Sequence, residues 1–257
     1  MYYIKETTLL SEILTWKDFI ILALCALTIG GNKAGLRGIN IIVIPIFASY
    51  FGGRTSASTV LPLLILGDIF SVYIYRKSIK WSYLRQLLPS TLLGLTAGMI
   101  MGQMVPDRVF MMVMAIFILI CLILMLIKEF SKTGIKLPDH WLAHGAAGFT
   151  GGFSTMVGNA AGPIMSLYLL SMNLPKMVFI GTGAVFFFTV NLIKVPVHAL
   201  VWKSMTWETL KISLALAPFV LLGLFIGLKL VKKIPERPFR LFIILGTLAG
   251  TIKLFLG

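Results

Sequence analysis

Two basic side chains lie inside a glycine-rich stretch that interrupts the first long apolar run of the sequence. Lys33 and Arg37 fall between Gly30 and Gly38, with about 12 or 13 apolar residues on either side, enough for only ~19 Å of helix in each arm. A basic residue held at the centre of a bilayer costs roughly 2.5–3.5 kcal/mol. We therefore expect one or both of Lys33 and Arg37 to face a cavity and bind an anion, with Gly35 and Gly38 allowing close approach of the backbone. The alternative is that the break reaches a membrane interface, where water solvates both side chains.

A second polar break interrupts a later apolar run over residues 151–163. It holds Ser154, Thr155 and Asn159, whose hydroxyl and amide groups can hydrogen-bond an oxyanion without adding charge. The helix that resumes after a break points its N-terminus into the membrane, where free N–H groups and the helix dipole favour an anion. Gly162 lies at that point in the second break and is a further expected contact. The alternative role of the polar side chains is to cap the broken helix ends.

Two further charged side chains lie within apolar runs. Asn191 and Lys194 are three residues apart and so share one face of a helix, with Thr182 on the same helix. We expect these three residues to be additional anion ligands. Asp68 either carries a coupling ion or proton, or forms a structural ion pair with a buried lysine, and the residues alone leave both roles open.

The remaining residues that could do chemistry favour no metal site, no cofactor and no catalytic function. His140 and His144 have metal-ligand spacing, but no glutamate lies between them and they fall at the start of a helix, so we interpret them as an interfacial pair. Cys25 and Cys121 lie in apolar runs, where a thiol is usually a small buried hydrophobe. The sequence has no nucleophile-elbow, Walker or paired-carboxylate motif, which disfavours an enzyme.

The elements that must position these side chains are membrane-spanning helices. The chain has 257 residues, of which 58% are hydrophobic and only 12% are charged, and its mean hydropathy is +0.95. A soluble domain carries about 25% charged residues, and an apolar run of about 20 residues suffices to cross a bilayer. The formal net charge of +14 falls mostly in short gaps between the apolar runs, which is the positive-inside pattern and not a nucleic-acid surface. We therefore expect an all-α, multi-pass membrane protein whose partners are lipid and a small anion, with no nucleic acid.

The order of the apolar runs divides the chain into a lead and two halves. Residues 1–18 are amphipathic and either lie on the membrane interface or form a frayed terminus. We assign residues 19–130 to a first transmembrane repeat and residues 131–257 to a second. Each repeat begins with a broken apolar segment, at 19–51 and 141–172, and continues with three spans, near 56–75, 84–105 and 108–127 in the first and near 177–201, 208–230 and 238–256 in the second.

An internal repeat is indicated by a motif that occurs in both halves at the same spacing, a Leu-Leu-Gly-Leu run followed by a second glycine and then a proline. The paired glycines form small-xxx-small faces that pack helices closely, either within one protomer or between the protomers of a homodimer. The two copies of the motif are Leu92–Leu95 with Gly98 and Pro106, and Leu221–Leu224 with Gly227 and Pro235.

Each broken segment either crosses the membrane or returns as a re-entrant hairpin. The first case gives eight membrane crossings and the second gives six. Both divide the basic loop residues between the two sides of the membrane in nearly the same way, so the positive-inside rule does not distinguish the two topologies. We favour hairpins, because half-length arms that meet at a polar, glycine-rich tip are what a re-entrant loop requires. The repeats would then be inverted, and substrate would bind where the two breaks face each other.

Five stretches of this sequence match the signature pattern of one family of membrane proteins, namely 32–45, 61–77, 158–170, 181–184 and 191–196. Through them the chain resembles the TauE/SafE family, the sulfite exporters of bacterial membranes, over nearly its whole length after residue 18. The first stretch is similar to the family's S-K-T-G-x-x-G…P segment, with Asn32 and Ala34 in place of Ser and Thr. One departure is Arg37, which stands where relatives commonly have Pro or Gly.

The resemblance implies a permease of the bacterial inner membrane that moves small anionic sulfur compounds such as sulfite or organosulfonates. We expect a secondary transporter, and specifically an exporter driven by an ion gradient, that works by alternating access around a site between the breaks. Two alternatives stay open, an anion channel and a carrier of other small organic anions such as carboxylates. A membrane-embedded enzyme would instead require catalytic geometry among the polar residues of the breaks.

Overall fold

The computed structural model describes residues 15–36, 42–130, 140–172 and 174–230, and all the regular elements in those ranges are helices. Four of these helices are long and apolar enough to cross a membrane, judged by length and composition. The predicted helical membrane architecture is therefore confirmed at this level. The four are α4 (Gly53–Tyr75), α5 (Trp81–Met104), α9 (Lys176–Pro196) with the π-helical turn η2 (Val197–Val201) that continues it, and α10 (Trp207–Leu230).

These four helices coincide with the spans expected near 56–75, 84–105, 177–201 and 208–230. The span expected near 108–127 lies within α6 (Asp107–Phe130), a helix of 24 residues. The span expected near 238–256 and most of the 1–18 lead lie outside the described residues.

The first broken segment consists of α2 (Trp16–Lys33) and α3 (Val43–Phe51). A capping box formed by Thr15 and Asp18 starts α2. The sequence predicts a break from Gly30 onward, but the helix continues to Lys33 because Gly30 packs against the backbone of another helix. The arms are therefore unequal: α2 has 18 residues and α3 has 9, or about 27 and 14 Å of helix.

The second broken segment consists of α7 (Trp141–Gly158) and α8 (Ala161–Ser171). Only two residues separate these helices, so the break predicted over 151–163 is too wide. Gly152 stays helical because it too faces a neighbouring helix backbone. Asn159 ends α7 with φ 55° and ψ 24°, a left-handed conformation that asparagine tolerates better than most residues.

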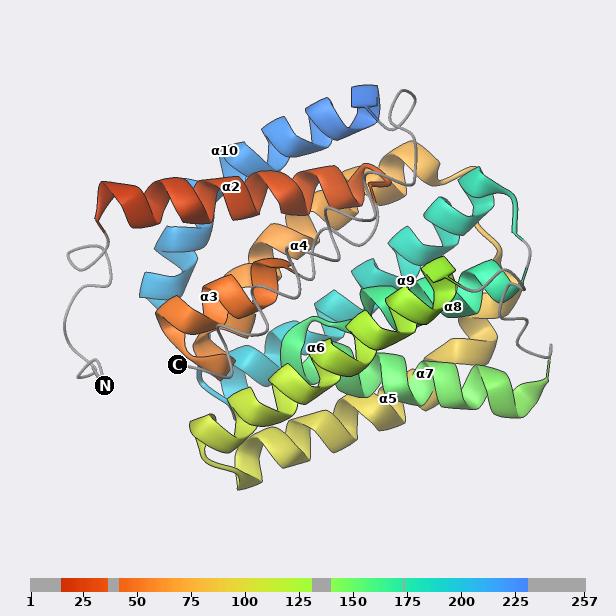
Figure 1. Ribbon diagram of the computed structural model, residues 1–257, viewed down its shortest axis with the longest axis horizontal. Coiled ribbons are helices and arrows are strands. Elements are labelled where there is room, and N and C mark those ends of the chain that lie inside the picture. The colour runs from red at the N-terminus through yellow and green to blue at the C-terminus, as the bar shows by residue number, and fades with distance from the viewer. Residues whose placement is uncertain (1–14, 37–41, 131–139, 173, 231–257) are drawn as a thin grey trace.

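Helices from the two halves lie side by side in two pairs, α2 with α10 and α5 with α7 (Figure 1). Both contacts are so close that only glycine fits. In the first pair, a Cβ atom at Gly30 would lie 1.9 Å from the carbonyl oxygen of Val220. In the second pair, a Cβ atom at Gly152 would lie 2.2 Å from the carbonyl oxygen of Thr91. Each half of the chain therefore contributes one helix that packs against the other half: α5 packs on α7, and α10 packs on α2.

In each pair, the helix that packs against α2 or α7 carries the glycines of the repeated sequence motif. These helices are α10 and α5. A Cβ atom at Gly94 of α5 would lie 2.1 Å from the carbonyl oxygen of Phe149, and one at Gly223 of α10 would lie 1.9 Å from that of Leu27. These small-xxx-small faces pack helices within the chain, so a homodimer would have to use another surface.

The apolar core is also built from helices of both halves. One cluster of buried side chains joins α2, α3 and α4 to α10, and a second joins α7, α8 and α9 to α5. A third cluster links α3 and α6 with the end of α7. Each cluster contains helices from both halves, which holds the two broken segments close to each other.

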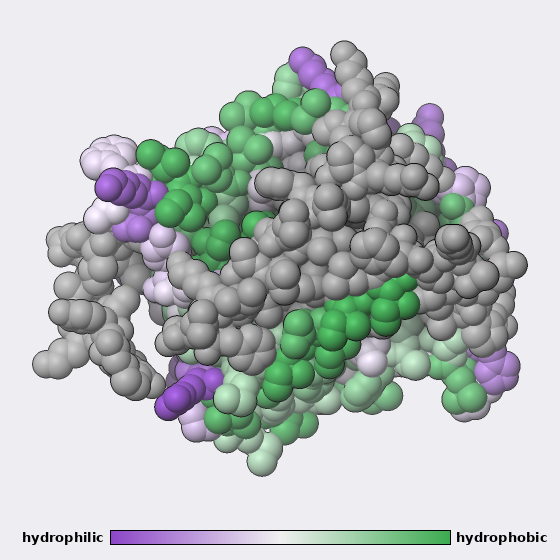
Figure 2. Space-filling view, in the orientation of Figure 1, coloured by the Kyte–Doolittle hydropathy of each residue, from purple (hydrophilic) through white to green (hydrophobic). Residues whose placement is uncertain are grey.

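The outer surface is apolar along α6, where Figure 2 shows a continuous hydrophobic band. Large exposed apolar patches on a folded protein mark membrane or partner contacts, and a lipid-facing helix presents such a face. The large apolar side chains described as exposed on this helix are Val109, Met112, Ile116, Ile120, Ile123 and Ile127.

Candidate functional site

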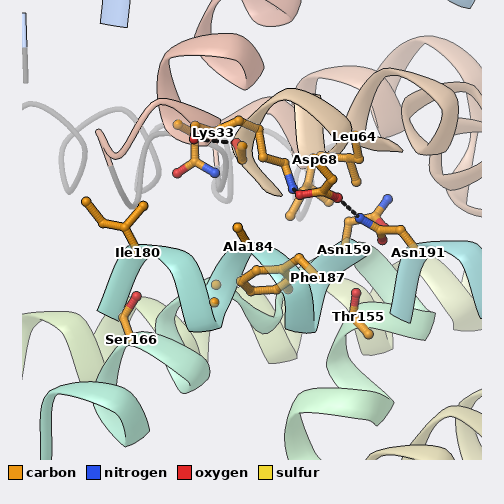
Figure 3. Close-up of a pocket in the computed structure, with 16 residues that line it drawn as sticks. Lys33, Leu64, Asp68, Thr155, Asn159, Ser166, Ile180, Ala184, Phe187 and Asn191 are labelled. Atoms are coloured by element: carbon orange, nitrogen blue, oxygen red, sulfur yellow. Dashed lines mark hydrogen bonds and ion pairs between the residues drawn. The ribbon is translucent and has the colours of Figure 1, made fainter. Parts of the chain in front are cut away.

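The C-terminal end of α2 places Lys33 beside Asp68 of α4 in the interior (Figure 3). Lys33 Nζ lies 2.5 Å from Asp68 Oδ1, and the aspartate is fully buried. Gly67 makes room for the lysine, because a Cβ atom there would lie 2.7 Å from Lys33 Cγ. The ammonium also lies 5.3 Å from the ring centre of Phe187 on α9, within cation–π range. The charge of Lys33 thus has a buried counterion.

Side chains of α4 also satisfy the last carbonyl groups of α2. The Ser71 hydroxyl donates to the carbonyl oxygen of Lys33 at 2.6 Å, and the Tyr75 hydroxyl donates to that of Ala34 at 2.9 Å. The final carbonyls of a helix otherwise lack partners within the helix. These two hydrogen bonds allow α2 to end inside the protein, beside the Lys33–Asp68 pair.

Asn191 of α9 joins this ion pair to the second half of the chain (Figure 3). Its Nδ2 atom donates to Asp68 Oδ2 at 2.7 Å. One carboxylate oxygen therefore accepts from Lys33 and the other from Asn191, so that Asp68 connects α2, α4 and α9.

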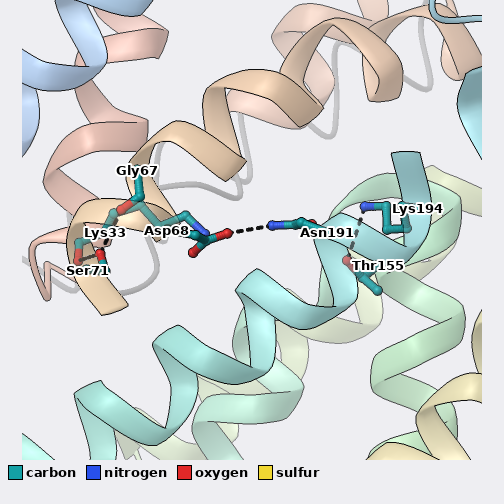
Figure 4. Close-up of polar contacts among 7 residues, drawn as sticks. All are labelled: Lys33, Gly67, Asp68, Ser71, Thr155, Asn191 and Lys194. Carbon is teal, nitrogen blue, oxygen red and sulfur yellow. Dashed lines mark hydrogen bonds and ion pairs between the residues drawn. The ribbon is translucent and has the colours of Figure 1, made fainter. Parts of the chain in front are cut away.

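The end of α7 places Asn159 and Thr155 beside Lys194 of α9. The backbone N–H of Asn159 donates to the carbonyl oxygen of Thr155 at 3.0 Å, and the left-handed turn then leads into α8. Lys194 Nζ donates to the side-chain oxygen of Asn159. It also donates to Thr155 Oγ1 at 3.4 Å (Figure 4). Lys194 is fully buried, and both of these partners are neutral.

A cavity of about 70 Å³ lies between these two polar groups (Figure 3). It has room for about five water molecules, or for one small oxyanion. Its walls come from α2, α3, α4, α7, α8 and α9, together with the short connection between α7 and α8. Six residues predicted from the sequence line it, namely Lys33, Asp68, Thr155, Asn159, Gly162 and Asn191.

Three other predicted ligands are not among the lining residues. Lys194 adjoins the cavity through the two lining residues that it contacts. The Ser154 hydroxyl donates to the carbonyl oxygen of Gly151 at 3.2 Å, within α7. Thr182 Oγ1 accepts from the backbone N–H of Lys80 at 2.9 Å and so holds the start of α5. Ser154 and Thr182 therefore satisfy backbone groups in this structure.

Gly35, another predicted contact, lies in the turn after α2 with a φ of 116°, a value that favours glycine. It turns the chain and is not among the residues that line the cavity. Arg37 and Gly38 lie outside the described residues.

Several lining residues were not singled out from the sequence, although helical spacing offered a signal for some of them. Ser71 lies three residues after Asp68, and Phe187 lies four residues before Asn191, so each shares a helix face with a predicted residue. Leu64 and Ser166 lie four residues from Asp68 and Gly162 in the same way. These additional lining residues include Ser71, Ser166, Ile180, Ala184 and Phe187.

The charges around the cavity do not balance. Lys33 and Asp68 neutralise each other, whereas the partners of Lys194 in the described part of the chain are neutral. Counted in their usual ionised forms, the three side chains together carry one excess positive charge, whose field is strong in a low-dielectric interior. Within the described ranges, no cluster of three or more His, Cys, Asp and Glu residues could hold a metal ion. The arrangement can hold one small anion by charge and by hydrogen bonds.

A family model described as Sulfite exporter TauE/SafE matches residues 21–254, nearly the whole chain. The match includes both breaks and both polar groups at the cavity, so it confirms the resemblance drawn from the sequence motifs. No match exists among the curated proteins or the solved structures that were compared with the chain.

Proposed function

This chain belongs to the TauE/SafE family of sulfite exporters, and on that premise we propose that it is a secondary transporter of small anionic sulfur compounds such as sulfite or organosulfonates. It is a multi-pass membrane protein. It would lie in the inner membrane of a bacterial cell and export its substrate at the expense of an ion gradient. The substrate would bind in the cavity between the ends of α2 and α7.

The observation that carries this proposal is the buried ammonium of Lys194. The side chain is fully buried, and it donates to the neutral oxygens of Thr155 and Asn159. Burying a charge without an opposite charge is unfavourable by several kcal/mol. A bound anion would supply that opposite charge, so the substrate would complete a site that the protein leaves electrically unbalanced.

The other polar groups would take distinct roles. Asn159 accepts from Lys194 through its oxygen, which leaves the amide NH₂ group to donate to a substrate. Gly162 lies in the first turn of α8, and a Cβ atom there would meet nothing within 4 Å, so an anion can approach the N–H groups of this helix. Lys33 is paired with Asp68, so it would position the Asp68 carboxylate and would not supply the main positive charge that attracts the substrate.

Alternating access would arise from two inverted repeats that rock against each other. The contact of Gly30 with Val220 has a counterpart in the contact of Gly152 with Thr91, with each residue in a corresponding helix of the other half. This correspondence supports the repeat. The short second arms α3 and α8, of 9 and 11 residues, give only about 14 and 17 Å of helix and support re-entrant segments that reach mid-membrane.

Sulfite flux into or out of proteoliposomes tests the proposal. We expect saturable flux for the wild type and a reduction of roughly 30-fold or more for Lys194→Met, which keeps the bulk of the side chain and removes its charge. Thr96→Val, at an exposed position of α5 outside the cavity, is the control and should transport normally. Absence of flux for every small anion would refute transport, and non-saturable flux that ignores the gradient would indicate a channel.

A further inference from the structure

Asn191 lines the cavity and carries a buried hydrogen-bond acceptor that has no donor in the described part of the chain. Its Oδ1 atom is buried and lacks a hydrogen-bond partner in the described part of the chain. The amide cannot be turned round, because Nδ2 donates to Asp68 at 2.7 Å and an ionised carboxylate only accepts. The oxygen therefore points away from Asp68, toward the side where Lys194 and Thr155 lie (Figure 4). A buried acceptor of this kind calls for a donor from the ligand.

The hydrogen bonds that the neighbouring polar side chains form in the described part of the chain do not reach this oxygen. Lys33 donates to Asp68, and the Ser71 hydroxyl donates to the carbonyl oxygens of Lys33 and Gly67. The ammonium of Lys194 donates to the end of α7. A ligand in the cavity would thus meet several donors and, at Asn191, one acceptor.

The charges set a second condition on the ligand. Lys33, Asp68 and Lys194 leave one excess positive charge, which a single negative charge balances. Sulfate and fully deprotonated sulfite carry two negative charges and no donor. Alkanesulfonates carry one negative charge but also no donor. The singly protonated form of sulfite has both the single charge and, in its O–H form, the donor.

We infer that the site selects monoanions that carry a hydroxyl group, such as singly protonated sulfite or a hydroxyalkanesulfonate, and that Asn191 is the residue that recognises the hydroxyl. The ligand O–H would donate to Asn191 Oδ1, while the ligand oxygens would accept from the amide of Asn159 and the hydroxyl of Thr155. This inference rests on the proposed function and names the form of the substrate that the same site takes.

Calorimetric titration of the purified full-length protein tests this selectivity. Sulfite, methanesulfonate and sulfate are compared at one pH below and one pH above the second ionisation of sulfurous acid. At the lower pH we expect sulfite to bind at least about tenfold more tightly than methanesulfonate, because a site built around a hydroxyl rejects an analogue that lacks it. Only sulfite should bind more weakly at the higher pH. Methanesulfonate keeps its charge at both pH values, so it controls for any effect of pH on the protein itself.

Asn191→Leu removes the acceptor and should bring the ratio of sulfite to methanesulfonate affinity close to one, whereas Thr96→Val should keep the wild-type ratio. This affinity ratio is informative even if Asn191→Leu binds all anions weakly. If that variant does not fold, the comparison of sulfite with methanesulfonate in the wild type still tests the hydroxyl requirement. Equal binding of the two anions by the wild type, or an unchanged ratio in Asn191→Leu, would overturn the hydroxyl requirement and leave anion transport intact. A wild type that binds no anion would overturn both proposals.

Discussion

Replacing Lys33 and Asp68 singly and together separates a structural ion pair from a coupling role for the aspartate. Lys33→Met leaves a buried carboxylate with Asn191 as its donor, and Asp68→Asn leaves a buried ammonium with a neutral partner. Each single change breaks a buried pair at 2.5 Å, and such a break typically costs about 3–5 kcal/mol.

That cost is large beside the total stability of a folded domain, which is about 5–15 kcal/mol. In a chain of this size each kcal/mol lowers the unfolding midpoint by about 2–4 °C, so we expect each single variant to unfold roughly 6–20 °C below the wild type. The double variant has neither charge and should recover most of the loss, because replacing both members of a buried pair with neutral residues is often close to neutral. The asparagine at position 68 can still accept from Asn191.

Thermal unfolding in detergent at a fixed scan rate gives the midpoints, and sulfite flux in proteoliposomes gives the function. Losses that simply add in the double variant would refute the ion pair, since residues in contact should show an interaction energy. A stable double variant that still transports would make Asp68 structural. A stable double variant that has lost gradient-driven flux would show that Asp68 carries the coupling ion or proton.

Two other substitutions test the packing and the break. Gly223→Ala should lower the unfolding midpoint sharply, because the new Cβ atom would lie 1.9 Å from a carbonyl oxygen of α2, whereas Gly145→Ala meets nothing within 4 Å and should not lower it. Equal midpoints would contradict the close contact of α2 with α10. Asn159→Gly keeps the left-handed turn but loses the amide that accepts from Lys194, so it should transport poorly, while Asn159→Ala should be less stable than the glycine variant by a further ~1–2 kcal/mol. Normal flux in the glycine variant would exclude the Asn159 side chain from the site.

The sequence identified most of the polar residues at the cavity but not how they pair. Lys33 and Asp68 are 35 residues apart, and Asp68 and Asn191 are 123 apart. Whether Asp68 meets Lys33 or Lys194 depends on how α4 packs between α2 and α9, and no local pattern encodes that choice. The motifs could therefore place two lysines near a cavity without showing that one of them has a counterion.

The boundaries that the glycines predicted for both breaks were also wrong. A glycine inside a helix is unfavourable by about 1 kcal/mol relative to alanine, so a cluster of glycines in an apolar run predicts an interruption. Gly30 and Gly152 are nevertheless helical, because each allows a backbone contact that any side chain would prevent. The same residue type serves turns and close packing, and the two uses are distinguished only when the neighbouring helix is known.

The two halves of the chain contribute different charges to the cavity, and that difference indicates where an anion would bind. On α4, Asp68 faces a lysine at the end of α2, whereas on α9 Lys194 faces neutral oxygens at the end of α7. The excess positive charge therefore lies on the side of α7 and α9. The Asp68–Asn191 hydrogen bond joins the two halves at the cavity, so relative motion of the halves has to break it unless α4 and α9 move together. An anion that contacts Asn191 and Lys194 would bind with different affinity to the conformation that has the Asp68–Asn191 hydrogen bond and to the one that lacks it. Such a difference in affinity is the condition for a substrate to drive a conformational change.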